Sequence, residues 1–470
     1  MTDEQTADTI PAEGRDVEVP SRTAIPKTEA FTRFIASGWA DRPRTLPPLR
    51  PLAARAAARR DALSARHPGT RLVIAAGDAK VRSNDTDYPY RAHSAFSWLT
   101  AWGADTVPGS LLVFEPTDDG HDVTLHFQPA AGRDTDEFYA NAAIGEFWVG
   151  PRPTVDEVGA DLGLATKPLD AFRAGGADVT LEDTDLERDL SEARLVKDEG
   201  EVAELRAAVA ATKQGFDDVL ASLPRIVEHE RGERVIEGVF FTRARAEGNE
   251  LGYDTIAAAG PHACILHWTR NDGPVVPGDL VLMDAGVEMP SLYTADITRT
   301  FPVSGTFSPV QREIYEAVRE AADAAFAVVR PGIVFREVHE AAMAVIAEKV
   351  RGWGLPKLDP SVLEGLEGQA HRRYMVHGTS HHLGLDVHDC QQARKEFYID
   401  GTVEAGMVFT IEPGLYFQPD DLTVPEEFRG IGVRIEDDVL VTADGSENLS
   451  AGIPRTADDV EAWLAERARA

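Results

Sequence analysis

The sequence predicts a mixed α/β (α+β) protein in which a smaller N-terminal α/β domain precedes a larger C-terminal domain. The chain has 470 residues, which at about 150 residues per domain is enough for two to three domains. In both halves, short apolar runs typical of strands alternate with longer stretches of helical periodicity. A charge-dense segment at 181–197 separates the halves. We therefore expect an N-terminal extension at 1–50, an α/β domain at 51–195 and a second domain at 196–470.

The N-terminal extension is predicted to be partly disordered. Residues 1–22 contain six acids and two bases without any apolar period, so they bury too little apolar surface to fold. A short helical pattern covers 27–38, and the proline-containing segment 42–48 predicts an extended connector. In the following domain, residues 53–66 favour a helix, whereas the apolar runs 71–76 and 110–115 favour strands.

The C-terminal domain combines well-signalled helices with short strands. One helix starts near Glu201, and another is bounded by Ser308 as N-cap, Pro309 at the first position and Gln311 completing a capping box. Further helices are expected at 230–247, 335–351 and 457–468. The expected strands are 253–259, 264–267, 280–286, 406–412 and 431–442.

Charge and cysteine content exclude several classes of protein. Lys and Arg number 47 against 79 Asp and Glu, a net charge of −32, which disfavours binding to nucleic acid or to an anionic membrane surface. No run of 18 apolar residues occurs, so no membrane span is expected. The two cysteines, Cys264 and Cys390, together with the lack of a signal-peptide pattern, predict a cytoplasmic protein.

Four carboxylates lie in or next to strand-like apolar runs: Asp284, Asp296, Glu412 and Glu436. A charged group at the end of a buried strand is costly unless another charge compensates it. An aspartate shortly before Gly286 is by itself an ordinary turn signal. Four such acids on separate strand faces instead indicate a set that shares cations.

A histidine segment, residues 376–388, adds the second half of the chemical signal. It holds four of the 13 histidines, a residue type used as acid, base or metal ligand. A zinc site from His377 and His381, four residues apart, is one alternative. A site of four carboxylates and one imidazole better suits hard cations such as Mn²⁺, Mg²⁺ or Fe²⁺. Two such ions sharing carboxylates hydrolyse amides or phosphate esters, and the lack of a glycine-rich phosphate loop favours amides.

The ordered set Asp284, Asp296, His381, Glu412 and Glu436 resembles the dinuclear metal site of the pita-bread metallopeptidases (metallopeptidase family M24). The flanking strings are similar to the bacterial proline-specific aminopeptidase P branch of that family. The strings that carry this similarity are 264–267, 284–286, 296–302, 377–389, 412–416 and 429–438, together with 82–91 and 147–150 in the N-terminal half.

The resemblance implies a pita-bread catalytic domain behind a creatinase-like N-terminal domain. It also implies two divalent metal ions, for which we expect Mn²⁺. Asp284 would bind one metal, Asp296 and Glu436 would bridge both, and His381 and Glu412 would bind the other. Glu412 would also act as the general base. The same family pattern implies that Thr298 orients Asp296.

The resemblance further implies a set of residues around the substrate. The implied catalytic residues besides Glu412 are His267, His377, His388 and Arg434, and the implied substrate-binding residues are Tyr416, Asp85 and Trp148. The family also suggests a homo-oligomer, a dimer or tetramer, in which Trp148 reaches a neighbouring site.

The expected reaction is release of an N-terminal residue from peptides with proline in second position. A Xaa-Pro bond has no N–H, so the enzyme must recognise the ring instead. A prolidase, which cleaves Xaa-Pro dipeptides, and a non-catalytic pita-bread binding module remain alternatives. Two departures from the family pattern stand out: the spacing of 12 from Asp284 to Asp296 is one residue longer than expected, and Cys390-Gln391-Gln392 replaces a small apolar residue and glycine.

Overall fold

The computed structural model describes residue 26 and residues 28–40 and 45–467, which fall into two compact units. The smaller unit joins the described residues up to Thr45 with residues 129–154, and the larger unit holds residues 46–128 and everything from 155 onward. The segment 1–22, predicted to be disordered, lies outside the described residues. The predicted division at residues 50 and 195 stays a prediction.

Aromatic side chains hold the smaller unit together. Its helix α1 (Glu29–Ala36) lies within the predicted helical range and is capped by Thr28, whose hydroxyl accepts the N–H of Phe31. The rings of Phe31 and Tyr139 lie 5.4 Å apart, and Trp39 meets both Phe138 and Phe147 edge-on. Residues 129–154, with α4 (Asp136–Ala140) and α5 (Glu146–Val149), therefore pack with the extension.

The N-terminal domain is built on a five-stranded sheet with the order β6-β5-β4-β1-β7. The central strands pair antiparallel and the two outer strands pair parallel. These strands are β1 (Leu72–Ala75), β4 (Leu111–Thr117), β5 (Gly120–Phe127), β6 (Ala165–Pro168) and β7 (Val179–Thr180), and the helices are α2 (Ala53–Arg66), α3 (Ser94–Thr100) and α6 (Val155–Leu162). The helix predicted at 53–66 and the strands at 71–76 and 110–115 are confirmed. A small exposed hairpin, β2 (Val81–Ser83) and β3 (Thr86–Asp87), completes the domain.

The charge-dense boundary segment forms a helix, α7 (Thr184–Ala193), capped by Asp183. It leads to α8 (Glu199–Ala221), where Asp198 and Glu201 form a capping box. The α-helices that follow are α9 (Leu223–Glu228), α10 (Gly232–Glu247), α11 (Pro309–Val328), α12 (Arg336–Gly352) and α13 (Ala457–Arg467). The capping box predicted for Ser308 and Gln311 is present at the start of α11.

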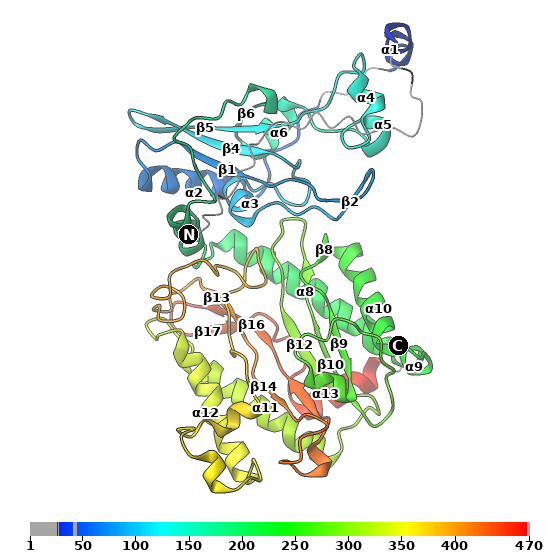
Figure 1. Ribbon diagram of the computed structural model, residues 1–470, viewed down its shortest axis with the longest axis vertical. Helices are drawn as coiled ribbons and strands as arrows, with labels where there is room; N and C mark the ends of the chain where they lie inside the picture. Colours follow the sequence, from blue (N-terminus) through cyan, green and yellow to red (C-terminus); the bar gives the residue numbers. More distant parts are fainter. Residues whose placement is uncertain (1–25, 27, 41–44, 468–470) are drawn as a thin grey trace, which may run out of the picture. The chain divides into compact units, whose positions relative to one another are not determined.

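Short strands form the centre of the C-terminal half, which follows the boundary helix α7 (Figure 1). One sheet has the order β12-β10-β9 and another has the order β13-β16-β17, while β11 pairs with β8 and β14 with β15. Their bounds are β8 (Glu250–Leu251), β9 (Ile256–Ala259), β10 (Leu280–Ala285), β11 (Val287–Glu288), β12 (Ile297–Pro302), β13 (Val408–Ile411), β14 (Gly414–Tyr416), β15 (Gly432–Arg434), β16 (Asp437–Val441) and β17 (Ser446–Asn448). Helix α10 packs against β9, and α11 packs against β13, β14 and β15.

Two strand predictions were wrong. The segment 264–267 is a loop, because Gly260–Cys264 forms a 3-10 turn and the buried Glu233 accepts backbone N–H groups from Ala259 and Gly273 at the ends of this loop. The strand predicted at 431–442 is two strands, β15 and β16, that belong to different sheets. The chain changes sheets between Arg434 and Asp437.

Two hydrophobic cores support these layers. One lies in the C-terminal half and begins at Leu195. The other belongs mainly to the N-terminal domain but also includes Leu383 and Leu385 from the histidine segment. The histidine segment is therefore anchored in the N-terminal core. Within the described part of the chain, no helix combines the length and apolar character needed to cross a bilayer.

Candidate active site

Two features of the fold bring the four predicted acids together: a β-hairpin, and a place where two neighbouring strands both pass from one sheet to another. In the hairpin, Asp284 near the end of β10 pairs with Thr298 of β12, and Asp296 stands two residues before Thr298. Side chains alternate along a strand, so Asp296 and Thr298 share one face. The longer connection between the two aspartates does not disturb this register.

Glu412 and Glu436 occupy the points where two strands pass from one sheet to the next. Ile411 pairs with Asp437 in one sheet, and Gly414 pairs with Arg434 in the other. The two residues between each pair leave the ladder, and the N–H of Glu436 instead donates to the carbonyl of Thr298 at 3.1 Å. This bond ties the strand junction to the hairpin that carries the aspartates.

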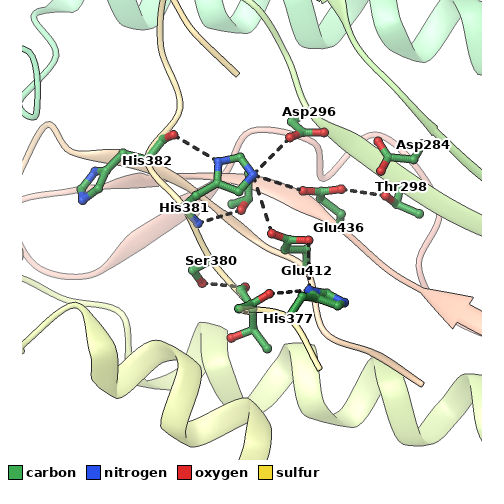
Figure 2. A network of polar contacts seen from close by, with 12 residues as sticks. Asp284, Asp296, Thr298, His377, Ser380, His381, His382, Glu412 and Glu436 are labelled. Atoms are coloured by element: carbon green, nitrogen blue, oxygen red, sulfur yellow. Dashed lines mark hydrogen bonds and ion pairs between the residues drawn. The ribbon is translucent and has the colours of Figure 1, made fainter. Parts of the chain in front are cut away.

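His381 faces this set of carboxylates (Figure 2). Its Nδ1 bonds the carbonyl of His382 at 3.2 Å, which makes Nδ1 the protonated nitrogen of the neutral ring and leaves Nε2 free to coordinate. Nε2 lies 3.3 Å from Asp296 Oδ2, 3.7 Å from Glu412 Oε1 and 4.0 Å from Glu436 Oε1. All these side chains are buried or nearly so.

The acids of the site lie so close together that neighbouring positive side chains do not neutralise all of their charge. Burial and the neighbouring Asp296 raise the pKa of Glu436 well above its usual value. Burial also raises the pKa of Glu412 to about 7, against the opposing effect of His381. Burial favours the neutral ring of His381, but Asp296 and Glu412 outweigh it and raise the pKa of His381 to about 9.

The carboxylates are oriented by partners behind them. Asp284 accepts hydrogen bonds from Tyr253 at 2.6 Å and from the Arg434 guanidinium. Thr298 donates to Glu436 Oε2 at 2.7 Å and accepts from Arg434 Nε. The expectation that Thr298 orients Asp296 was therefore wrong. Its hydroxyl lies between strands and reaches the junction carboxylate, which the linear sequence does not indicate.

Tyr416 joins two other predicted residues. Arg434 Nη1 donates to the Tyr416 hydroxyl at 3.1 Å, and His377 Nε2 lies 2.8 Å from the same oxygen. His377 Nδ1 contacts the carbonyl of Gly378. Burial and the positive charge of Arg434 lower the pKa of His377 to about 3. Because both ring nitrogens are engaged, the geometry does not support the alternative zinc pair of His377 and His381.

The acids line a cleft of about 580 Å³. Two exposed histidines, His267 and His388, also line it, and the ring of His388 lies 4.3 Å from that of His381. Ile256, Leu266 and Val387 supply apolar wall. The cleft therefore combines a charged set of acids with an apolar wall.

The structure gathers most of the predicted site residues in this cleft, but not all. Its lining includes Asp284, Asp296, His267, His377, His381, His388, Glu412, Arg434 and Glu436. Tyr416 is buried behind Arg434 and does not line the cleft. Asp85 lies on the exposed β2–β3 hairpin, and Trp148 lies in the smaller unit, where its indole N–H donates to the carbonyl of Tyr139. The substrate contacts expected of Asp85 and Trp148 stay predictions.

Two polar residues of the site were missed by the sequence reasoning. Tyr253 bonds Asp284, and Asp438 accepts the backbone N–H of Asp296 at 3.2 Å. A tyrosine between Gly252 and Asp254 carries no signal in the sequence. Asp438 follows Glu436 with the same strand alternation, and this spacing was a usable sign.

The donor set fits divalent metal ions. Ligand atoms of Asp296, His381 and Glu436 lie within 4.8 Å of one another, and all three residues are buried. Oxygen and imidazole donors suit hard or borderline cations, and the four acids provide charge for two of them. Such a centre can activate water and polarise a carbonyl.

Comparisons with known proteins place this geometry in a family. The model of metallopeptidase family M24 matches residues 203–443, and that of the aminopeptidase P N-terminal domain matches residues 56–179. The chain is 53% identical over 463 residues to Xaa-Pro aminopeptidase 1 of Streptomyces coelicolor, covering 93% of this chain and 92% of that protein. It is 34% identical to the Xaa-Pro aminopeptidase of Escherichia coli, covering 84% and 94%.

Solved structures of aminopeptidase P are also similar to this chain. Aminopeptidase P from Escherichia coli matches with a TM-score of 0.74 at 30% sequence identity, over 89% of this chain and 99% of that one. Proline aminopeptidase P II from Yersinia pestis matches with a TM-score of 0.72 at 32% identity, over 88% and 99%. The likeness extends over both the N-terminal domain and the catalytic half.

Proposed function

Because the chain belongs to metallopeptidase family M24 and to its Xaa-Pro aminopeptidases, we propose that it removes the N-terminal residue from peptides with proline in second position. The observation that carries this proposal is the convergence of Asp296, His381 and Glu436 at the cleft, with ligand atoms within 4.8 Å of one another. Asp284 and Glu412 line the same cleft. The chain is accordingly a metallo-aminopeptidase with the pita-bread fold.

The five residues would hold two divalent metal ions, Asp284 on one, His381 and Glu412 on the other, and Asp296 with Glu436 between them. We propose Mn²⁺, because the donors are four hard carboxylates and one imidazole. When bound, the metals supply Lewis acidity and an activated water. Tyr253 and Arg434, which bond Asp284, keep that carboxylate turned toward the site.

Glu412 is the group best placed to move the proton. Its Oε2 lies 3.7 Å from His377 Nδ1 and its Oε1 3.7 Å from His381 Nε2. In the proposed reaction Glu412 takes a proton from the attacking water and delivers it to the proline nitrogen as the C–N bond breaks. The nitrogen needs this proton because an amide nitrogen leaves as a neutral amine only when it is protonated. The released proline then carries the N–H that the Xaa-Pro amide lacks.

The remaining cleft residues bind and orient the substrate. His267 and His388 are exposed in the cleft and are proposed to contact the scissile carbonyl and its transition state. The apolar wall of Ile256, Leu266 and Val387 provides a surface for the proline ring. Arg434 and Tyr416 are proposed to hold His377 and Asp284 in place from behind.

Three further properties belong to this proposal. Both cysteines are buried free thiols, which supports a reducing compartment such as the cytoplasm. We also propose a homo-oligomer, in keeping with the expected role of Trp148. The strongly acidic composition supports small cationic peptide N-termini as partners rather than nucleic acid.

A cleavage panel tests the proposal. Purified enzyme with Mn²⁺ is given Xaa-Pro dipeptides, Xaa-Pro peptides of three to five residues, and matched peptides with alanine in place of proline. We expect release of the first residue from the longer proline peptides only. Cleavage restricted to dipeptides would instead identify a prolidase, and metal binding without any turnover would identify a binding module.

A further inference from the structure

A second cavity, of about 350 Å³, adjoins the catalytic cleft and has no role in the mechanism above. The two spaces share His388 and Gln391 in their walls. The second cavity continues between the N-terminal domain and the loop that follows His388. Its size lies within the range of ligand pockets. Residues of its wall that matter below are Arg91, His93, Glu187, Arg194, Asp386 and Gln392.

The position of the cavity relative to the scissile bond follows from the reaction, so this inference rests on the proposed function. An aminopeptidase holds a single residue on the amino side of the bond it cleaves. Any space that extends the cleft by more than one residue therefore belongs to the leaving part of the peptide. The second cavity begins at His388, beside the metal-ligating His381.

Most charges around this cavity already have partners. Arg91 bonds Glu288 at 2.6 Å and Asp386 at 3.1 Å. Arg194 contacts Asp389 at 3.2 Å, and Lys197 contacts the same carboxylate at 3.0 Å. Three cations thus face three anions, namely Arg91, Arg194 and Lys197 against Glu288, Asp386 and Asp389. The cavity would be electrically balanced by these six groups alone.

Glu187 adds a negative charge that is not balanced. It is half-buried in α7 and lines the cavity, and no lysine or arginine among the described residues forms an ion pair with it. Its titratable neighbour is His93, whose Nδ1 accepts the N–H of Ala95. Burial and Arg194 lower the pKa of His93, so this ring stays neutral at pH 7 and leaves the carboxylate uncompensated.

We propose that the second cavity is a subsite for the leaving part of the peptide, in which Glu187 selects a lysine or arginine side chain beyond the proline. The chain would then favour longer Xaa-Pro peptides that carry a basic residue. Both Gln391 and Gln392 depart from the family pattern; Gln391 lines the cleft and the subsite, and Gln392 lines the subsite.

A lysine scan tests this subsite. Peptides of the form Xaa-Pro-Ala-Ala-Ala carry lysine or glutamine at each position after proline in turn, and the ratio of kcat/KM for lysine over glutamine is measured. At one position we expect a ratio of about two to five in the wild type, which is the range of a partly exposed ion pair. In Glu187→Gln this ratio falls to about one, and in Glu187→Lys it falls below one.

Asp185→Asn is the matched control, because it removes the same charge from the same helix while Asp185 lies exposed outside the cavity. Its ratios should follow the wild type. Equal ratios in wild type and Glu187→Gln at every position would overturn the inference while leaving the proposed function standing. Failure of the wild type to cleave any Xaa-Pro peptide would overturn both. Turnover of an Xaa-Pro-Ala tripeptide by each variant shows that it is folded.

Discussion

Glu436 and Asp437 are neighbours in the chain and equally buried, but Asp437 is surrounded by positive charges and Glu436 by negative ones. Asp437 is paired with Arg299 and Arg455, both at 2.7 Å, and accepts a hydrogen bond from Ser450. Glu436, at the junction between β15 and β16, faces Asp296, Glu412 and Asp284. Burial tends to raise the pKa of Asp437, but Arg299 and Arg455 lower it, whereas the pKa of Glu436 is raised.

This contrast separates a structural carboxylate from a functional one. The protein supplies the counter-charges for Asp437, so that side chain can stabilise the fold without a bound ion. It leaves Glu436 and its companions to be neutralised by ions from outside. Each prediction below challenges that distinction, beginning with the largest expected effect.

Loss of the proposed general base, Glu412, should have the largest effect, a fall in kcat. Glu412→Gln keeps the size of the side chain but cannot accept a proton, so kcat should fall about 10²- to 10⁴-fold. Steady-state kinetics on a Xaa-Pro tripeptide with saturating Mn²⁺ measure this. The exposed Glu404→Gln serves as the control. Near wild-type turnover by Glu412→Gln would remove Glu412 from the mechanism.

For the structural carboxylate, Asp437→Asn should cost about 3–5 kcal/mol of unfolding free energy, because it leaves the buried Arg299 without its counter-charge. Glu436→Gln should do the opposite in the metal-free protein and raise the denaturation midpoint, since it removes one of several crowded acids. Chemical denaturation of both variants after chelation gives the comparison. If both substitutions shift stability in the same direction, the contrast between the neighbours fails.

Metal ions that bind the functional carboxylates should stabilise the folded protein directly. Free Mn²⁺ at about 100 times its dissociation constant adds about 2.7 kcal/mol to unfolding, provided it binds only the native state. In Glu436→Gln this gain should be largely lost, whereas a chelator should abolish activity in the wild type. Thermal unfolding with and without Mn²⁺ measures the gain. An undiminished gain in Glu436→Gln would place the metal elsewhere.

Removal of a hydrogen bond that orients a metal ligand should have a more moderate effect on metal affinity. Thr298→Val removes the hydroxyl that donates to Glu436, and metal affinity should weaken about 10- to 100-fold. Thr300→Val is the matched control, because Thr300 is equally buried on the same strand face but donates to the carbonyl of Arg434. Metal titration by calorimetry decides between them, and equal affinities would show that the Thr298 hydroxyl does not matter.

The metal-free protein should also become less stable as the pH rises. Folding raises the pKa of Glu412 from 4.5 to about 7 and that of His381 from 6.5 to about 9. The native state then binds more protons than the unfolded state, so stability should fall as pH rises from about 4.5 to 9. Melting temperatures of the chelated protein measure this slope. Saturating Mn²⁺ should weaken it, and a rise in metal-free stability over the same range would contradict the assignment.

Helix positions were well predicted from the sequence because their signals are local. The capping box of Ser308 and the apolar period of 53–66 need no tertiary information, and both are present. The predicted strand at 264–267 failed because the buried Glu233, far away in α10, accepts the loop's hydrogen bonds. The smaller unit likewise depends on contacts between α1 and residues more than 100 positions away.

The sequence by itself determined which side chains carry the chemistry. Four acids in apolar strands and one histidine segment are costly to bury without a cation, and their order matches one family. Only the tertiary structure decided how they are held, because strand pairing and sheet changes are non-local. It placed Glu412 and Glu436 at paired strand junctions and turned Asp437 away toward Arg299. It also left Glu187 without a counter-charge in the second cavity, which no local pattern could reveal.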